Sequence, residues 1–147
     1  EPSSGLDPFA WKRMIDELHD YMGKGDSTIL MSTHIVDEIK RLADFIILVH
    51  HGQILGMVEK DSLIDNWKEV WVKSDPSILE DLPAIVDAQQ ESTGVLRIIT
   101  TECKQLEDLL QASGIQVMKT RGLELDEILS RWIQRDEAAA AQSEGRE

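Results

Sequence analysis

The sequence predicts an α/β fold in two units, a sheet with flanking helices over residues 1–60 and a smaller α+β unit over residues 61–136. Three observations support this prediction. Apolar residues recur at helical spacing over residues 8–22, and a short apolar run of β type follows at residues 27–32. Beyond residue 61, short runs with strand character alternate with runs of helical period. The change of pattern near residue 60 therefore indicates a second unit.

Composition and charge narrow the classes of protein that the chain can belong to. The chain has 147 residues, with 15 basic and 28 acidic side chains, which fits one ordinary domain or two small ones. Because an acidic chain repels phosphate backbones, we expect no nucleic-acid partner. The single cysteine, Cys103, excludes an intrachain disulfide and fits a reducing compartment. The apolar run at residues 45–49 is far too short to cross a bilayer, and there is no signal peptide, so we expect a cytoplasmic location.

The first helix is predicted from Pro8 to about Met22. Asp7 can accept hydrogen bonds from the first turn, and proline at the next position has its φ already set for a helix. The residues that form its apolar stripe are Trp11, Met14, Ile15, Leu18, Tyr21 and Met22. Residues 27–32 are apolar without alternation, which is typical of a buried parallel strand. Thr33 and His34 follow this strand, at the position where open α/β sheets present ligand-binding residues.

A short helix and a hairpin are expected next. The helix over residues 35–42 should turn its charged side chains outward, and these are Asp37, Glu38, Lys40 and Arg41. Strands at residues 44–49 and 54–58 flank a tight turn that contains His50 and His51. Paired histidines can bind a metal, but no third ligand lies near them along the sequence, so we expect no metal site here.

The second unit has the element order strand, helix, strand, strand, helix, strand. After a short helix at residues 60–64, the strands are expected at 69–73, 84–89, 95–100 and 115–120, and the helices at 78–82 and 104–112. This order predicts a ferredoxin-like (split βαβ) arrangement. The second helix should bury Leu106, Leu109 and Leu110, with Cys103 as a half-buried residue near its start. A closing amphipathic helix is expected from Leu123 to about Gln134, followed by a flexible acidic, alanine-containing tail over residues 137–147.

Two spaced motifs resemble a known family. The chain begins Glu1-Pro2-Ser3-Ser4-Gly5-Leu6-Asp7-Pro8, and the stretch from Ser27 ends in Ser32-Thr33-His34. Together they resemble the ATP-binding subunits of ABC transporters, with the strongest resemblance over about residues 1–58. Further residues that fall where this family has similar ones are Asp37-Glu38, Ala43-Asp44 and Gly52-Gln53-Ile54. Residues 123–129 loosely resemble the ending of exporter-type members that serve drugs and polysaccharides.

The resemblance implies roles for particular residues. Glu1 matches the catalytic glutamate that follows the Walker B strand, and would polarise the attacking water as general base. His34 matches the switch histidine that contacts the γ-phosphate, although a histidine that caps the following helix is the other interpretation. The residues that match the D-loop, which reaches the partner's nucleotide site, are Ser4, Gly5, Leu6 and Asp7. The parent protein would use ATP and Mg²⁺, pair with a second ATPase subunit, identical or different, and lie at the inner face of the membrane on a permease.

The sequence also departs from the family, because it lacks the Walker A loop, the glutamine loop, the signature motif and the aspartate that should precede Glu1. We therefore expect the chain to be a C-terminal part that alone neither binds nor hydrolyses ATP. Residues 8–22 and 29–31 would leave an apolar surface and an open sheet edge, so self-association is expected. Two alternatives remain: a non-catalytic regulatory or interaction module, and a non-transport ABC ATPase of the DNA-repair or translation type, against which the acidic balance argues.

Overall fold

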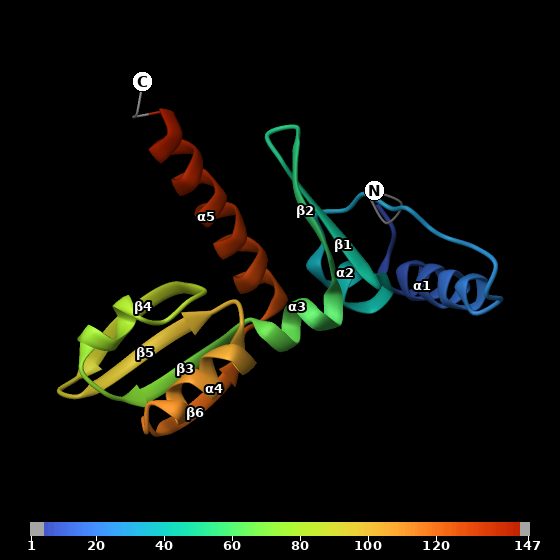
Figure 1. Ribbon diagram of the computed structural model, residues 1–147. Helices are drawn as coiled ribbons and strands as arrows, with labels where there is room; N and C mark the ends of the chain where they lie inside the picture. Colours follow the sequence, from blue (N-terminus) through green and yellow to red (C-terminus); the bar gives the residue numbers. More distant parts are fainter. Residues whose placement is uncertain (1–4, 145–147) are drawn as a thin grey trace.

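The computed structural model of the chain describes residues 5–144, and side chains up to residue 139, as a mixed α/β fold (Figure 1). The predicted site residues Glu1 and Ser4 lie outside the described residues. Helices and a hairpin form one group of elements, and a four-stranded sheet forms the other. The first group is α1 (Pro8–Met22), α2 (Val36–Leu42), β1 (Phe45–His50) and β2 (Gln53–Glu59). After α3 (Lys60–Asn66), the second group is β3 (Lys68–Lys73), η1 (Pro76–Glu80), β4 (Ile85–Ser92), β5 (Val95–Thr100), α4 (Cys103–Ala112), β6 (Val117–Gly122) and α5 (Leu125–Glu144).

Helix α1 begins and ends where the sequence predicts. A carboxylate oxygen of Asp7 accepts hydrogen bonds from the backbone N–H groups of Phe9, at 2.9 Å, and Ala10, at 3.1 Å. These bonds satisfy two donors that the first helical turn would otherwise leave without a partner. The prediction of Asp7 as the N-terminal cap, with Pro8 as the first helical residue, is confirmed.

The strand predicted at residues 27–32 is wrong. Residues 27–35 form neither helix nor strand, and Leu30 in this segment is 87% exposed. A parallel strand is held by hydrogen bonds to neighbouring strands on its two edges. Among the residues that the structure describes, none pairs with this segment. The local apolar pattern is therefore insufficient to make a strand here.

The hairpin of β1 and β2 has the shortest common loop. His50 pairs with Gln53 across the antiparallel ladder, so His51 and Gly52 alone form the turn. Both loop residues have positive φ, 46° at His51 and 76° at Gly52, as a type I′ turn requires. The large apolar side chains that are exposed on the hairpin are Phe45, Ile47, Val49, Ile54 and Met57. The hairpin therefore presents an apolar surface to solvent.

The four-stranded sheet has the strand order β4-β5-β3-β6, and all neighbouring strands are antiparallel. Helix α4 packs on the sheet and closes a core of seven buried residues, which are Val70, Val72, Leu96, Ile98, Cys103, Leu106 and Leu110. Leu109, predicted as buried, is 37% exposed and so lies at the margin of this core. The connection from β3 to β4 is the 3₁₀ helix η1 rather than a helix over residues 78–82, because Asp75 and Pro76 start it early.

A second core joins the two groups of elements. Its buried members come from the hairpin, from α3, from the sheet and from the start of α5, and they are Ile46, Leu63, Trp67, Ile99, Leu123, Leu125 and Ile128. Helix α5 continues to Glu144, although the sequence pattern predicted an end near Gln134. The added turns contain a run of alanines, the residue with the highest helix propensity, and so need no apolar stripe. Helix α5 therefore extends over residues that the sequence assigned to a tail.

Candidate functional site

The described residues of the predicted nucleotide site lie in exposed, irregular segments beside α1 and α2. Gly5, Leu6 and Asp7 precede α1 and are exposed. His34 is also exposed, two residues before α2 begins. The N-terminal cap of α2 is Ile35, which makes no side-chain capping bond, so the interpretation of His34 as a helix cap is wrong. The hydroxyl of Thr33 instead accepts a hydrogen bond of 3.0 Å from the Ile35 N–H.

The elements that carry these segments are joined through a buried carboxylate. Glu38 on α2 is fully buried, and its Oε1 accepts a hydrogen bond of 3.2 Å from the indole N–H of Trp11 on α1. The Arg41 guanidinium lies 5.1 Å from the centre of the Trp11 ring, within the range of a cation–π contact. The prediction of Glu38 as a solvated residue is wrong, because α1 packs over this side of α2. Glu38 thus connects the helix after the D-loop residues to the helix after His34.

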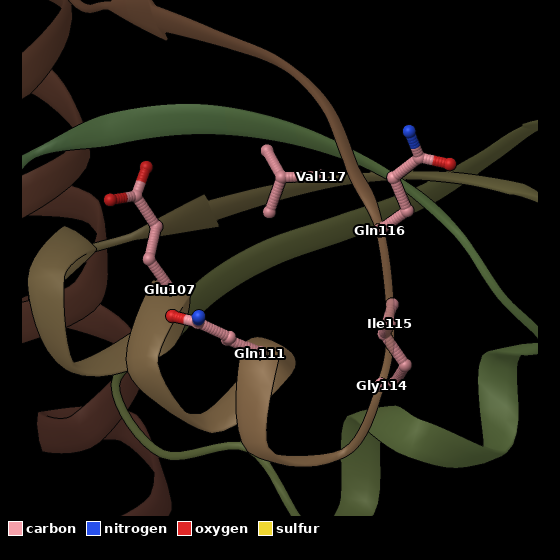
Figure 2. A pocket seen from close by; sticks show the side chains of 6 residues that line it. All are labelled: Glu107, Gln111, Gly114, Ile115, Gln116 and Val117. Carbon is pink, nitrogen blue, oxygen red and sulfur yellow. The ribbon is translucent and has the colours of Figure 1, made fainter.

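Two hollows in the described surface lie away from the motif residues. One, of about 410 Å³, lies between α4 and the chain that leads into β6; Figure 2 shows Glu107 and Gln111 on α4 and, across from them, the segment 114–117. The other, of about 520 Å³, lies between β2, α3 and α5 and is lined in part by Trp67, Trp132 and Asp136. Neither hollow is lined by Asp7 or His34. The hollows therefore do not form part of the predicted site.

The sheet carries a second buried carboxylate that the sequence analysis did not single out. Glu69 on β3 is 3% exposed, and its two oxygens accept hydrogen bonds of 2.6 Å from Arg97 on β5 and from Arg121 on β6. Burial alone would raise the pKa of Glu69, but the hydrogen bonds from Arg97 and Arg121 outweigh it, and the pKa lies below its ordinary value. The arrangement is a stable ion-pair centre rather than a proton-transfer group, because it holds Glu69 charged.

Cys103 has the environment of a structural thiol. It is 7% exposed at the start of α4. Burial, together with the nearby Glu107 carboxylate, raises the pKa of the Cys103 thiol to about 11. A thiol in this state has little thiolate at neutral pH, and thiolate is the nucleophilic form. Cys103 lies at the start of α4, as predicted, but it is buried rather than half-buried.

The cluster of three close ligands among the described residues does not suit Mg²⁺. This ion takes oxygen ligands in octahedral geometry and keeps several waters. Within residues 5–139, the side chains that gather as three close ligands are His50, His51 and Glu137, and two of these offer ring nitrogen. Imidazole nitrogen suits first-row transition metals instead. The motif residues and the potential metal ligands are therefore separate features of the molecule.

The chain is similar to curated transport proteins. It is 29% identical over 127 residues to the bacitracin transport ATP-binding protein BcrA of Bacillus licheniformis, a match that covers 81% of this chain and 42% of BcrA. It is 36% identical to the lantibiotic transport ATP-binding protein SrtF of Streptococcus pyogenes, over 42% of this chain and 26% of SrtF. A putative ABC transporter ATP-binding protein of Methanosarcina acetivorans is 30% identical over 69% of this chain and 31% of that protein. No family model matches the chain.

These similarities agree with the spaced motifs. The chain belongs to the family of ABC transporter ATP-binding proteins, and it spans less than half the length of the three relatives named above. Within residues 5–144, none of the helices combines the length and the apolar character that crossing a bilayer requires.

Proposed function

We propose that this chain is the C-terminal part of the ATP-hydrolysing subunit of an ABC transporter, which moves a substrate through a partner permease. The observation that carries the proposal is the match to BcrA, which covers 81% of this chain. The exposed placement of His34 and of Gly5, Leu6 and Asp7 supports it, because both segments must reach a nucleotide held between two subunits. On its own, the chain is not expected to bind ATP.

The proposed chemistry is phosphoanhydride hydrolysis. Glu1 orients the attacking water as general base, and His34 donates a hydrogen bond to the γ-phosphate. Ser4, Gly5, Leu6 and Asp7 contact the nucleotide site of the second ATPase subunit, which is identical or different. Catalysis of this kind rests on positioning and charge stabilisation. The protein would work at the inner face of the membrane, on its permease.

The substrate class follows from the relatives. The names of BcrA and SrtF refer to transport of bacitracin and of a lantibiotic, and another relative is a Nod factor export protein of a Bradyrhizobium strain. We propose an exporter-type transporter for a compound of the kind that these names give.

Replacing His34 with alanine tests the proposed function. The test uses the longer protein of which we propose this chain is a part, assembled with its permease. There, kcat for ATP hydrolysis should fall roughly 100-fold, the loss that follows removal of one hydrogen-bond donor to charge developing in the transition state. KM should change little, because the proposed hydrogen bond contributes more in the transition state than in bound ATP. His19→Ala is the matched control, since His19 is exposed on α1, and it should leave the rate unchanged. An unchanged kcat in His34→Ala would contradict the role of His34.

We further infer that the isolated chain self-associates through exposed apolar surface. Phe9 is 82% exposed, and on the hairpin Ile54 is 70% and Met57 is 68% exposed. Light scattering should therefore give a mass above that of one chain, and this mass should fall towards the monomer in Ile54→Thr/Met57→Thr. Thr replaces Ile and Met with little loss of strand preference. A stable monomer at all concentrations would argue against self-association.

The C-terminal unit is proposed to be ferredoxin-like. The strand order β4-β5-β3-β6 and the antiparallel neighbours support this arrangement, although η1 is short for the first crossover helix. We propose that the unit regulates the ATPase through contacts with the hairpin and α2.

A further inference from the structure

We propose that His50, His51 and Glu137 form a binding site for a divalent first-row transition metal, of which Zn²⁺ is the representative. The two histidines lie at the tip of the β1–β2 hairpin, and Glu137 lies on α5. Along the sequence no third ligand lies near the two histidines, and that spacing alone argues against a metal here. The structure brings that third ligand from 87 positions further on.

The geometry of the three side chains is close to that of a metal site. His50 Nε2 and Glu137 Oε1 are 2.9 Å apart, and one ligand atom from each of the three residues lies within 4.8 Å of the others. The rings of His50 and His51 have centroids 4.1 Å apart and are tilted by 56°. Ligand atoms of a tetrahedral Zn²⁺ lie about 3.4 Å apart, as bond lengths of about 2.1 Å require. The side chains of His51 and Glu137 are exposed, so they have room to rotate towards this spacing.

The backbone holds the ligands in this position by two features. The first is the type I′ turn, which places His51 at φ 46° directly after His50 and so directs two successive imidazoles from one hairpin tip. The second is the close contact of α5 with the hairpin. A Cβ atom on Gly56 would lie 2.8 Å from Cζ2 of Trp132, so only glycine lets the indole approach β2 this closely. Glu137 lies about one and a half helical turns beyond Trp132 on α5.

The donor set selects the class of metal. Two neutral imidazoles and one carboxylate are the ligands of Zn²⁺ sites that keep one position open to water. Ca²⁺ and Mg²⁺ prefer oxygen ligands throughout, so they are poor occupants of a site with two ring nitrogens. His50 is the most sheltered of the three side chains, with 24% of its surface exposed, while His51 and Glu137 are exposed. Water can therefore complete the coordination.

A bound metal would fasten the hairpin tip to α5. The hairpin belongs to the group of elements that carries the motif residues, and α5 also contacts the four-stranded sheet, through an ion pair of 3.6 Å between Arg131 and Asp87. Three metal–ligand bonds would replace a single contact between His50 and Glu137. The consequence is a metal-dependent link between the two groups of elements.

Titration of the metal-free chain of residues 1–147 with Zn²⁺ tests the proposal. Isothermal titration calorimetry should show one ion bound per chain. In His51→Asn the new residue still tolerates positive φ, but a ligand is removed. Zn²⁺ binding should weaken by at least about tenfold, because tenfold is the smaller loss that follows removal of a residue that only supports a metal ligand. His19→Asn removes an exposed histidine from α1 and serves as the matched control, with unchanged affinity.

A second readout separates a specific site from general attraction of cations to an acidic chain. At a hundredfold excess over the dissociation constant, Zn²⁺ should raise the Tm of the wild-type chain by roughly 5 to 10 °C, and Mg²⁺ should not. Co²⁺ should give the intense visible absorption of a tetrahedral complex in the wild type and lose it in Glu137→Gln. If His51→Asn and His19→Asn bind Zn²⁺ as tightly as the wild type, the proposal is wrong, and His50 and Glu137 form an ion pair only.

Discussion

Replacing Glu69 with glutamine is expected to lower the free energy of unfolding by about 3 kcal/mol at pH 7, the lower end of the range for breaking a buried ion pair. The substitution keeps the shape of the side chain but removes the charge that Arg97 and Arg121 approach at 2.6 Å. Arg97, whose side chain is 20% exposed, then faces a neutral amide in place of the carboxylate of Glu69. Denaturant unfolding followed by tryptophan fluorescence measures the change.

The same carboxylate makes stability depend on pH in a defined direction. Since the pKa of Glu69 is lower in the folded chain than its ordinary value of 4.5, the stabilisation is fully present above that value and is lost as the pH falls through the lower, folded pKa. The difference in stability between the wild type and Glu69→Gln should therefore narrow below about pH 4.5. A difference that stays constant down to pH 3 would show that the charge of Glu69 is not the cause.

Glu91 provides the matched control for Glu69. Its carboxylate lies 3.7 Å from the same Arg97, but 47% of its side chain is exposed. Exposed pairs contribute about 0 to 1 kcal/mol, because solvent screens the charges. Glu91→Gln should therefore change the free energy of unfolding by less than about 1 kcal/mol, and a loss as large as that of Glu69→Gln would contradict the importance of burial.

Leu110→Ala is expected to destabilise the chain by about 3 kcal/mol, within the range for a leucine removed from a closed core. Leu110 is fully buried between α4 and the four-stranded sheet, where it packs with Leu106 and Ile98 among others. The neighbouring Leu109 is 37% exposed, so Leu109→Ala should cost less than about 1 kcal/mol. Equal losses from the two substitutions would show that α4 does not pack through the face of Leu110.

Local patterns predicted the elements whose hydrogen bonds and contacts are local. The cap at Asp7 confirms the start of α1, and the hairpin forms where two β-type runs flank His51 and Gly52. The run at residues 27–32 also has an apolar pattern, yet forms no strand, because a strand depends on partners that the pattern does not contain. Amphipathic spacing likewise placed Leu109 in the core, although it lies at the edge of the buried stripe of α4.

Features of the candidate sites that depend on distant residues could not be predicted from the sequence. Glu38 has the spacing of an outward-facing residue on α2, but it is buried and bonded to Trp11 on another helix. Glu137 reaches His50 because α5 continues beyond Gln134, where the amphipathic pattern ends. By contrast, the exposure of His34 agrees with its predicted role in contacting a nucleotide.

The core that joins the hairpin to α5 has a consequence for the order of folding. Ile46 belongs to one cluster with Leu125 and Ile128, so the hairpin completes its buried contacts only after the residues up to 128 have been synthesised. The sheet of β3 to β6 with α4 closes its own core from residues between 70 and 117, and can form earlier. We therefore expect the nascent chain to contain a folded sheet while the hairpin still lacks part of its buried contacts. Chaperones can bind the exposed apolar surface at this stage.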